Sequence, residues 1–311
     1  MKNILKLMLF AFMAVSFAAC SDNEEYDADT AVTPYEPLPG RRVAQVKTTK
    51  TIDGRLYSWE HNFSYDALGR IKEINSNIVH HRAVSFDNVV RYYVCNITSK
   101  ANYYYNGEKF RVEYGVSWEF PEYSDWNKRK NGREYGLFNE DGTLAKISSM
   151  DMVYSKTQLL RGYVDGGYIY ELQRDARGNV TGFLLYSSKN GGDESVELDC
   201  GNELCYTGAV KNKTNFDFSG YFGCWGVEQG IDKLINETYY ASYQLAAFGM
   251  LGAISSYLPS EMLARDNGGK VIKDENGKPK YLVVKWQCDD EDCPVLFVDD
   301  SGRRIEIKYV D

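Results

Sequence analysis

The sequence predicts a mainly β protein: a strongly curved antiparallel β-meander, forming an open or partial barrel of about 12 strands, with one buried helix near the C-terminal third. Three observations support this prediction. Runs rich in tyrosine and β-branched residues recur along the chain, a turn motif containing glycine separates them, and one apolar segment has helical spacing. The chain has 25 tyrosines and 27 glycines but only seven prolines in 311 residues, which suits strands joined by tight turns.

The first element along the chain is an export signal. Lys2 and Lys6 precede an apolar run that ends in FAAC, residues 17–20, and this arrangement is typical of a secretory signal. The end of the run resembles the lipobox of bacterial lipoproteins, in which the cysteine thiol accepts a diacylglycerol. The resemblance implies that residues 1–19 are removed, that Cys20 is lipidated, and that its acyl chains anchor the protein to a membrane. An ordinary signal peptide with a coincidental cysteine is the alternative.

A tether is expected over residues 20–40, because this stretch is proline-bearing and poor in apolar residues. Ser21 after the cysteine resembles outer-membrane sorting in diderm bacteria, and the acidic SDNEE at 21–25 resembles the surface-export signal of Bacteroidetes lipoproteins. A plain solvated linker is the alternative for the acidic cluster. Thr30, in Asp-Thr-Ala, resembles the O-glycosylation sequon of the same phylum. These resemblances imply an outer-membrane lipoprotein that is lipid-anchored, with the cell surface as its expected location.

Residues 41–311 are expected to form a single β-meander domain. Without residues 1–19, 292 residues remain and the formal charge changes from −8 to −10, because Lys2 and Lys6 are lost. An acidic protein has no general attraction for nucleic acid, so no nucleic-acid partner is expected. We expect a monomer.

Six of the seven cysteines remain once Cys20 is set aside, and an even number in an exported chain favours disulfides. CGNELC and CDDEDC each place two cysteines on either side of four residues, which suits facing positions of a hairpin. Other pairings stay open, and a zinc site built from the two motifs is the rival, although an oxidising compartment argues against it. The simplest pairing is Cys200–Cys205, Cys288–Cys293 and Cys95–Cys224.

A turn motif recurs from residue 65 onward: Asp or Asn, two residues, then Gly. The Asp or Asn side chain bonds the backbone two residues on, and glycine accepts the positive φ that closes a type I turn with a bulge. Asn139 and Asp175 are 36 positions apart, which corresponds to two strands and two turns. The motif occurs in YDALGRI (65–71), NEDGTL (139–144), RDARGNV (174–180), RDNGGKV (265–271), KDENGKP (273–279) and VDDSGRR (298–304).

The runs beside these turns are expected to be strands, since β-branched and aromatic residues dominate them. Short connections between them point to an antiparallel meander, because parallel strands need long crossovers. The clearest runs are residues 89–97, 109–120, 167–173, 181–188, 281–286 and 304–310.

Residues 231–258 break the strand pattern, because their apolar residues recur at helical spacing until Pro259. Between residues 245 and 254 every side chain is apolar or small, which predicts a helix buried on all sides. This apolar core is too short to cross a bilayer. We therefore expect the helix to lie in the concave side of the curved sheet.

The lipobox, the Tyr-Asp-x-x-Gly-Arg turn at 65–70 and the segment FGMLGAISSYLPSEM at 248–262 together resemble a family of Bacteroidetes lipoproteins of unknown function with a porin-like fold. The resemblance covers most of residues 41–311 and implies a curved sheet, but no reaction. The turn motif also resembles the YD repeats of secreted toxins and teneurins. Strands such as 109–120 carry charges on both faces, so we do not expect a bilayer pore.

No catalytic signature stands out, so no enzyme activity, cofactor or metal is expected. The chain has three histidines and lacks G-x-S-x-G, P-loop and H-E-x-x-H motifs. Trp126, within the polar PEYSDWNKRKNG, is the candidate for an exposed aromatic that binds a ligand such as a sugar ring. The sequence therefore favours a non-catalytic binding or structural module for a glycan or a partner envelope protein. A glycoside-acting enzyme with paired carboxylates is the alternative.

Overall fold

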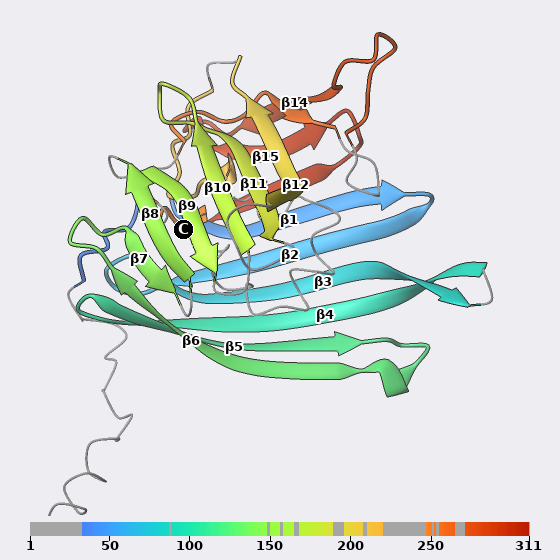
Figure 1. Ribbon diagram of the computed structural model, residues 1–311, viewed down its shortest axis with the longest axis horizontal. Coiled ribbons are helices and arrows are strands. Elements are labelled where there is room, and N and C mark those ends of the chain that lie inside the picture. The colour runs from blue at the N-terminus through green and yellow to red at the C-terminus, as the bar shows by residue number, and fades with distance from the viewer. Residues whose placement is uncertain are drawn as a thin grey trace, which may run out of the picture.

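The computed structural model of the protein describes residues 33–310 with several gaps (Figure 1). The described ranges are 33–86, 89–147, 150–155, 158–164, 168–188, 196–207, 210–219, 247–250, 252, 255–264 and 271–310.

Sixteen strands and one short 3₁₀ turn form the described chain. The strands are β1 (Val43–Ile52), β2 (Arg55–Tyr65), β3 (Ile71–Phe86), β4 (Val89–Asn106), β5 (Lys109–Glu119), β6 (Lys128–Phe138), β7 (Leu144–Ile147), β8 (Met150–Ser155), β9 (Gln158–Val164), β10 (Tyr168–Arg174), β11 (Val180–Ser188), β12 (Val196–Cys205), β13 (Glu261–Leu263), β14 (Tyr281–Cys288), β15 (Pro294–Asp299) and β16 (Arg304–Tyr309). The 3₁₀ turn is η1 (Ser124–Trp126).

Every strand pairs antiparallel with its neighbours in chain order, and β16 lies beside β1, so the hydrogen-bonded neighbours follow one another round a ring. Two links of this ring are narrow: β12 joins β13 only through Leu204–Met262 and Cys205–Glu261, and β7 joins β8 only through Lys146–Asp151 and Ile147–Met150. The predicted mainly β meander is confirmed. The predicted open or partial barrel corresponds to a curved sheet whose first and last strands, β1 and β16, pair with each other. The predicted number of about 12 strands was too low, because strands as short as β7 and β13 contain too few residues to show an alternation of apolar and polar side chains.

The long strands β1–β6 lie side by side, and the shorter strands β7–β12 rise from them at a steep angle (Figure 1). Along β2 the inward side chains alternate with outward ones, so that Tyr57, Trp59, His61 and Phe63 are all buried. The same alternation in the other long strands gathers the core on the concave side of the sheet. Aromatic rings fill much of it: Phe248 contacts Phe63 and Phe216 at centroid distances of 5.3 and 5.5 Å.

The predicted turn motif is confirmed in the described residues. At the β2–β3 turn, Asp66 Oδ1 accepts hydrogen bonds from the backbone N–H of Leu68 and Arg70, at 3.0 and 2.9 Å. Gly69 adopts the positive φ that the turn requires, +85°. The same two bonds to Oδ1 recur at Asp175, Asp274, Asp289 and Asp299. The predicted turn at 265–271 falls largely outside the described residues.

The predicted helix over residues 231–258 lies outside the described residues as far as residue 246. Ala247, the first described residue of this segment, is helical, and the chain then makes tight turns: Gly249 and Gly252 have φ of +76° and +106°, and Gly252 N–H bonds the carbonyl of Gly249. Among the described residues, Phe218, Ser219 and Ala247 have α-helical backbone, but no complete α-helix is described. Since glycines at positive φ leave the helical conformation, the predicted end of the helix at residue 258 is wrong, and the described chain is not helical beyond Ala247. Among the described residues, no helix is long and apolar enough to span a membrane.

The part of the predicted tether that the structure describes, residues 33–40, packs against the sheet. Tyr35 is buried, its ring stacks on Phe138 at 5.5 Å, and its hydroxyl donates to the carbonyl of Phe248 at 2.9 Å. The side chain of Leu38 lies close against Gly249. Tyr35 and Leu38 are therefore packed against the β domain, although both precede residue 41.

The predicted disulfides are not present among the described residues. Cys200 and Cys205 both belong to β12, which is one continuous strand, and five residues of strand separate their Cα atoms by roughly 16 Å, too far for a disulfide. Cys288 and Cys293 do flank a tight turn, but a bulge places Cys288 opposite Pro294. Cys293 is buried and Cys288 is exposed, and both are free thiols. Cys95 is buried, and its predicted partner Cys224 lies outside the described residues.

Candidate functional site

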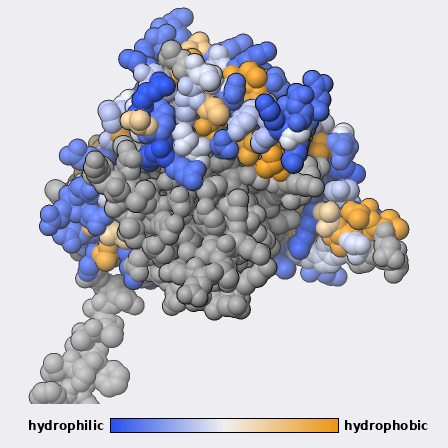
Figure 2. Space-filling model, turned by 45° about the horizontal axis from the view of Figure 1, so that its top comes forward, coloured by the Kyte–Doolittle hydropathy of each residue, from blue (hydrophilic) through white to orange (hydrophobic). Residues whose placement is uncertain are grey.

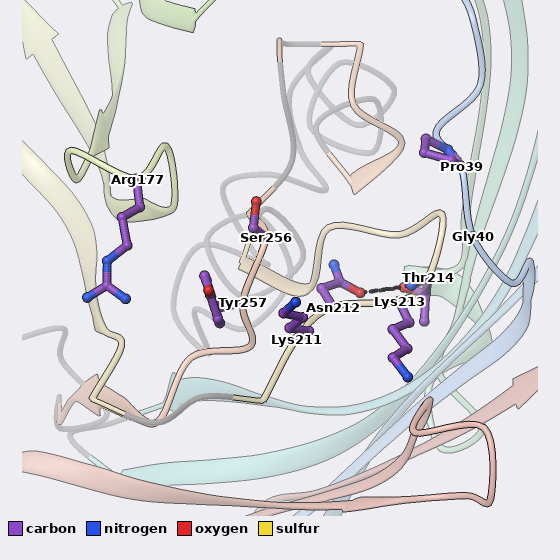
Figure 3. A pocket seen from close by; sticks show the side chains of 9 residues that line it. All are labelled: Pro39, Gly40, Arg177, Lys211, Asn212, Lys213, Thr214, Ser256 and Tyr257. Carbon is purple, nitrogen blue, oxygen red and sulfur yellow. Dashed lines mark hydrogen bonds between the residues drawn. The ribbon is translucent and has the colours of Figure 1, made fainter.

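A pocket of about 610 Å³ opens at the end of the sheet where β10 turns into β11 (Figure 3). Two further segments, residues 211–214 and 256–257, complete it together with the chain that leads into β1. Three of the lining residues are cations and none is an acid, although the chain holds 44 acids against 36 bases. We call it the cationic pocket; it is lined by Pro39, Gly40, Arg177, Lys211, Asn212, Lys213, Thr214, Ser256 and Tyr257.

Arg177 reaches the pocket from the β10–β11 turn. The turn is fixed by Asp175, whose Oδ1 accepts the N–H of Arg177 at 2.8 Å and that of Asn179 at 2.9 Å. Asn179 in turn accepts the N–H of Tyr257 through Oδ1 at 3.2 Å, which ties the opposite wall to this turn. The guanidinium of Arg177 lies 5.7 Å from the ring centroid of Tyr257, within the range of a cation–π contact. Arg177 therefore lies beside an aromatic face.

The 211–214 segment is held by hydrogen bonds on both sides. Lys211 pairs with Tyr257 as a single antiparallel bridge, and Asn212 N–H donates to the carbonyl of Ser256 at 2.9 Å. The Asn212 side-chain carbonyl accepts from the Thr214 hydroxyl at 2.8 Å, the bond drawn in Figure 3. Because backbone and amide contacts fix the segment, the lysine side chains are left to project from it.

Gly40 closes the other side of the pocket at a point of very close approach. Its φ is +118°, and a Cβ there would lie only 2.6 Å from the carbonyl oxygen of Lys213. The neighbouring N–H of Arg41 donates to that carbonyl at 3.1 Å. Only glycine fits both the dihedral angle and the contact, so this wall depends on it.

The three cations differ in their electrostatic surroundings. Lys213 Nζ lies 2.6 Å from Asp292 Oδ2, and this hydrogen bond raises the pKa of Lys213. Asp292 belongs to the acidic β14–β15 turn, which also holds Arg41 through Asp289 at 2.6 Å. Arg177 and Lys211 form no ion pair with any described residue. Two of the three positive charges therefore remain available to an anion in the pocket.

A second group of polar side chains is buried inside the sheet. Glu134, on the inner face of β6, is only 3% exposed, and burial raises the pKa of its carboxyl group to about 7. Within the described part of the chain, the charge that acts on it is that of Lys130, not that of a second carboxylate. Burial also lowers the pKa of His61 to about 3, and its Nδ1 lies 2.8 Å from Ser76 Oγ. The described residues thus bring no two carboxylates together here.

Trp126, the predicted ligand-binding residue, lies in η1 as part of an aromatic cluster. Its ring stacks on Tyr123 at 4.7 Å and meets Tyr93 and Phe120 edge-on at 5.5 and 5.7 Å. One of its faces is therefore already engaged in packing. The cluster is remote in sequence and topology from the cationic pocket. The other predicted modification sites, Cys20 and Thr30, lie outside the described residues.

Sequence reasoning did not select the residues of the cationic pocket. Lys211 and Lys213 form a small basic group in the sequence KNK, and Arg177 sits within a recognised turn motif. Neither signal shows that these residues line one pocket. The pocket is assembled by pairing between segments that are distant in the sequence, Lys211 with Tyr257 and Arg41 with Thr214. The pocket therefore exists only where the fold brings these distant segments together.

No protein-family model matches the chain, and no curated protein does. Solved structures that are similar to it include two porin-like proteins. A porin-like protein from Bacteroides uniformis ATCC 8492 covers 89% of this chain and 100% of its own, with 8% identity and a TM-score of 0.44. A porin-like protein from Bacteroides vulgatus ATCC 8482 covers 87% of this chain and 99% of its own, with 12% identity and a TM-score of 0.35. The chain is thus structurally similar, at low sequence identity, to porin-like proteins of Bacteroides.

Proposed function

We propose that this protein is a non-catalytic, monomeric binding module of the bacterial surface, and that the cationic pocket holds an anionic glycan. The observation that carries the proposal is a pocket with three cations and no acid in an acidic protein. Its volume of about 610 Å³ lies within the usual range of small-ligand sites. The pocket is locally positive although the protein as a whole is negatively charged, so it favours an anionic ligand.

The pocket's remaining groups suit a sugar. Arg177 presents a planar fork that pairs with a carboxylate or a sulfate through two parallel bonds, and Lys211 adds a second positive charge. The Tyr257 ring offers an apolar face, and the Ser256 hydroxyl offers a hydrogen-bonding group to a neutral part of the ligand. Uronic acids and sulfated sugars combine these features in one residue.

The pocket cations give the test of this proposal. Wild-type protein is expected to bind a tetrasaccharide of alternating glucuronic acid and N-acetylglucosamine, and to bind neutral chitotetraose at least tenfold more weakly, in isothermal titration calorimetry. Arg177→Gln and Lys211→Gln should each weaken binding by about tenfold, since a hydrogen bond to a charged group contributes roughly 1.5–3 kcal/mol. Asp292→Asn should strengthen it, because Lys213 is then released to the ligand.

Lys278→Gln, on the remote Asp274–Lys278 turn, is the matched control and should bind like wild type. Binding should also weaken as salt is raised. Equal affinity for the two tetrasaccharides, or unchanged binding by the Arg177 and Lys211 variants, would show that the pocket is not the site of an anionic glycan.

We propose further that the mature chain is anchored to the outer membrane through Cys20. The FAAC end of the apolar run supports this. Expressed in a diderm host, the protein is expected to incorporate labelled palmitate and to sediment with membranes, and Cys20→Ala should abolish both. A Cys20→Ala variant that is still labelled would rule the anchor out.

A further inference from the structure

The hairpin of β3 and β4 extends beyond the strands on either side of it. Pairing of β3 with β2 stops at Val79, and pairing of β4 with β5 starts only at Asn96. Beyond those points residues 80–86 pair only with residues 89–95. We call these two stretches the projecting ribbon. It stands out from the end of the sheet opposite the β2–β3 turn (Figure 1).

The outer edges of the projecting ribbon carry backbone groups that no described strand pairs. Each edge of an isolated ribbon presents a row of N–H and C=O groups, which is a template for an added strand. At its base the ribbon is supported by the stacking of Arg55 on Tyr92 at 3.9 Å and by the edge contact of Tyr93 with Tyr123 at 4.9 Å. These contacts hold the base of the projecting ribbon in place, while described residues do not cover its outer part.

The side chains of the ribbon combine apolar and basic character. Val89, Val90 and Tyr92 are 54, 55 and 43% exposed, and Figure 2 shows apolar residues gathered on this projection. Arg82 and Arg91 accompany them, and neither forms an ion pair with a described residue. The described residues of the ribbon include no acid, and Asp87, between the two strands in the sequence, lies outside the described residues.

We infer that the projecting ribbon is a docking arm for an extended, acidic segment of a partner protein, which adds to one edge of the ribbon as a β-strand. Main-chain bonds to the unpaired edge would supply affinity, and alternate side chains would meet the valines and the arginines. The ribbon carries two arginines although the protein has a net negative charge, so an acidic partner segment is the one whose charge complements it.

Two other occupants fit less well. In a bilayer the unpaired edges would have no hydrogen-bonding partners, which costs several kcal/mol per group, and Arg82 and Arg91 would enter the apolar layer with them. A second copy of the ribbon would bring Arg82 and Arg91 against the same arginines. An acidic protein strand would bond the unpaired backbone groups of the edge and would also neutralise the charges of Arg82 and Arg91. This inference does not depend on the cationic pocket.

The test uses a fluorescein-labelled, capped decapeptide of alternating Glu and Val as the probe, with fluorescence anisotropy as the readout. Wild-type protein is expected to bind it, and NMR amide shifts are expected at Val89–Tyr92. The same peptide carrying N-methyl groups on alternate amides keeps its charges but cannot pair as a strand, and should bind at least tenfold more weakly. A Lys-Val decapeptide should not bind.

Arg82→Glu/Arg91→Glu is expected to weaken binding of the Glu-Val peptide at least tenfold, while its thermal melt stays close to wild type. Lys285→Glu/Lys308→Glu, which changes the same number of charges on exposed strand positions elsewhere, is the matched control and should bind as wild type does. The inference is overturned if the N-methylated peptide binds equally well, or if the Glu-Val peptide does not bind. It is also overturned if the ribbon instead binds phosphatidylglycerol vesicles in flotation, or if sedimentation shows a dimer that the arginine variant abolishes.

Discussion

Asp66→Asn is expected to lower the free energy of unfolding by about 3–5 kcal/mol, the cost usually found when one partner of a buried ion pair is removed. Asp66 Oδ2 lies 2.6 Å from Arg70 Nε, and both side chains are 1% exposed. The guanidinium of Arg70 also lies 4.3 Å from the centre of the Tyr105 ring. Asparagine keeps the side-chain oxygen that accepts the two backbone N–H groups of the turn. The substitution therefore removes mainly the charge that neutralises Arg70.

Urea unfolding of Asp66→Asn, Arg70→Met and the double variant gives the measurement. The double variant should be more stable than Asp66→Asn alone, because the buried positive charge is then gone as well. Asp175→Asn is the matched control: its turn has the same backbone bonds, but Asn179 replaces the arginine and the site is more exposed, so we expect a loss below about 1 kcal/mol. Equal losses at Asp66 and Asp175 would show that the turn, rather than the buried charge, determines the effect.

The comparison of these two turns also shows what could be predicted from the sequence. The Asp-x-x-Gly motif was recognisable because its hydrogen bonds are local: Asp66 bonds residues two and four positions ahead, and Gly69 needs only its own dihedral angle. Alternation along β2 was recognisable for a similar reason, since one face of each long strand is buried. Local patterns of this kind predicted the antiparallel meander.

Features that depend on contacts between distant segments were not predictable in this way. Spacing alone suggested that Cys200 and Cys205 face each other, but the pairing of Leu185 with Cys200 and of Cys205 with Glu261 makes them part of one strand. The helical spacing up to Leu258 did not show that the chain turns at Gly249 and Gly252, because small apolar residues suit both a buried helix and a tightly packed turn. The cationic pocket needs three segments to meet, and no single segment shows it.

Met250→Asp is expected to destabilise the protein by about 3–5 kcal/mol at pH 8, because it places an unpaired carboxylate in the core. Met250 is fully buried, and its carbonyl accepts the N–H of Leu144 at 2.8 Å, which joins this segment to the start of β7. Thermal melts and urea unfolding give the measurement. Met250→Leu, which nearly conserves volume, is the control and should cost less than about 1.5 kcal/mol.

The pH dependence of Met250→Asp separates a buried charge from simple loss of packing. Burial in the folded state raises the pKa of the new carboxyl group above its unfolded value, so the folded state binds the proton more tightly. The destabilisation should therefore be smallest below about pH 4, where the group is neutral in both states, and should grow as the pH rises through the folded-state pKa. A loss that is the same at pH 4 and pH 8 would mean that the side chain escapes to solvent, and that residues 247–250 do not close the core as the structure shows.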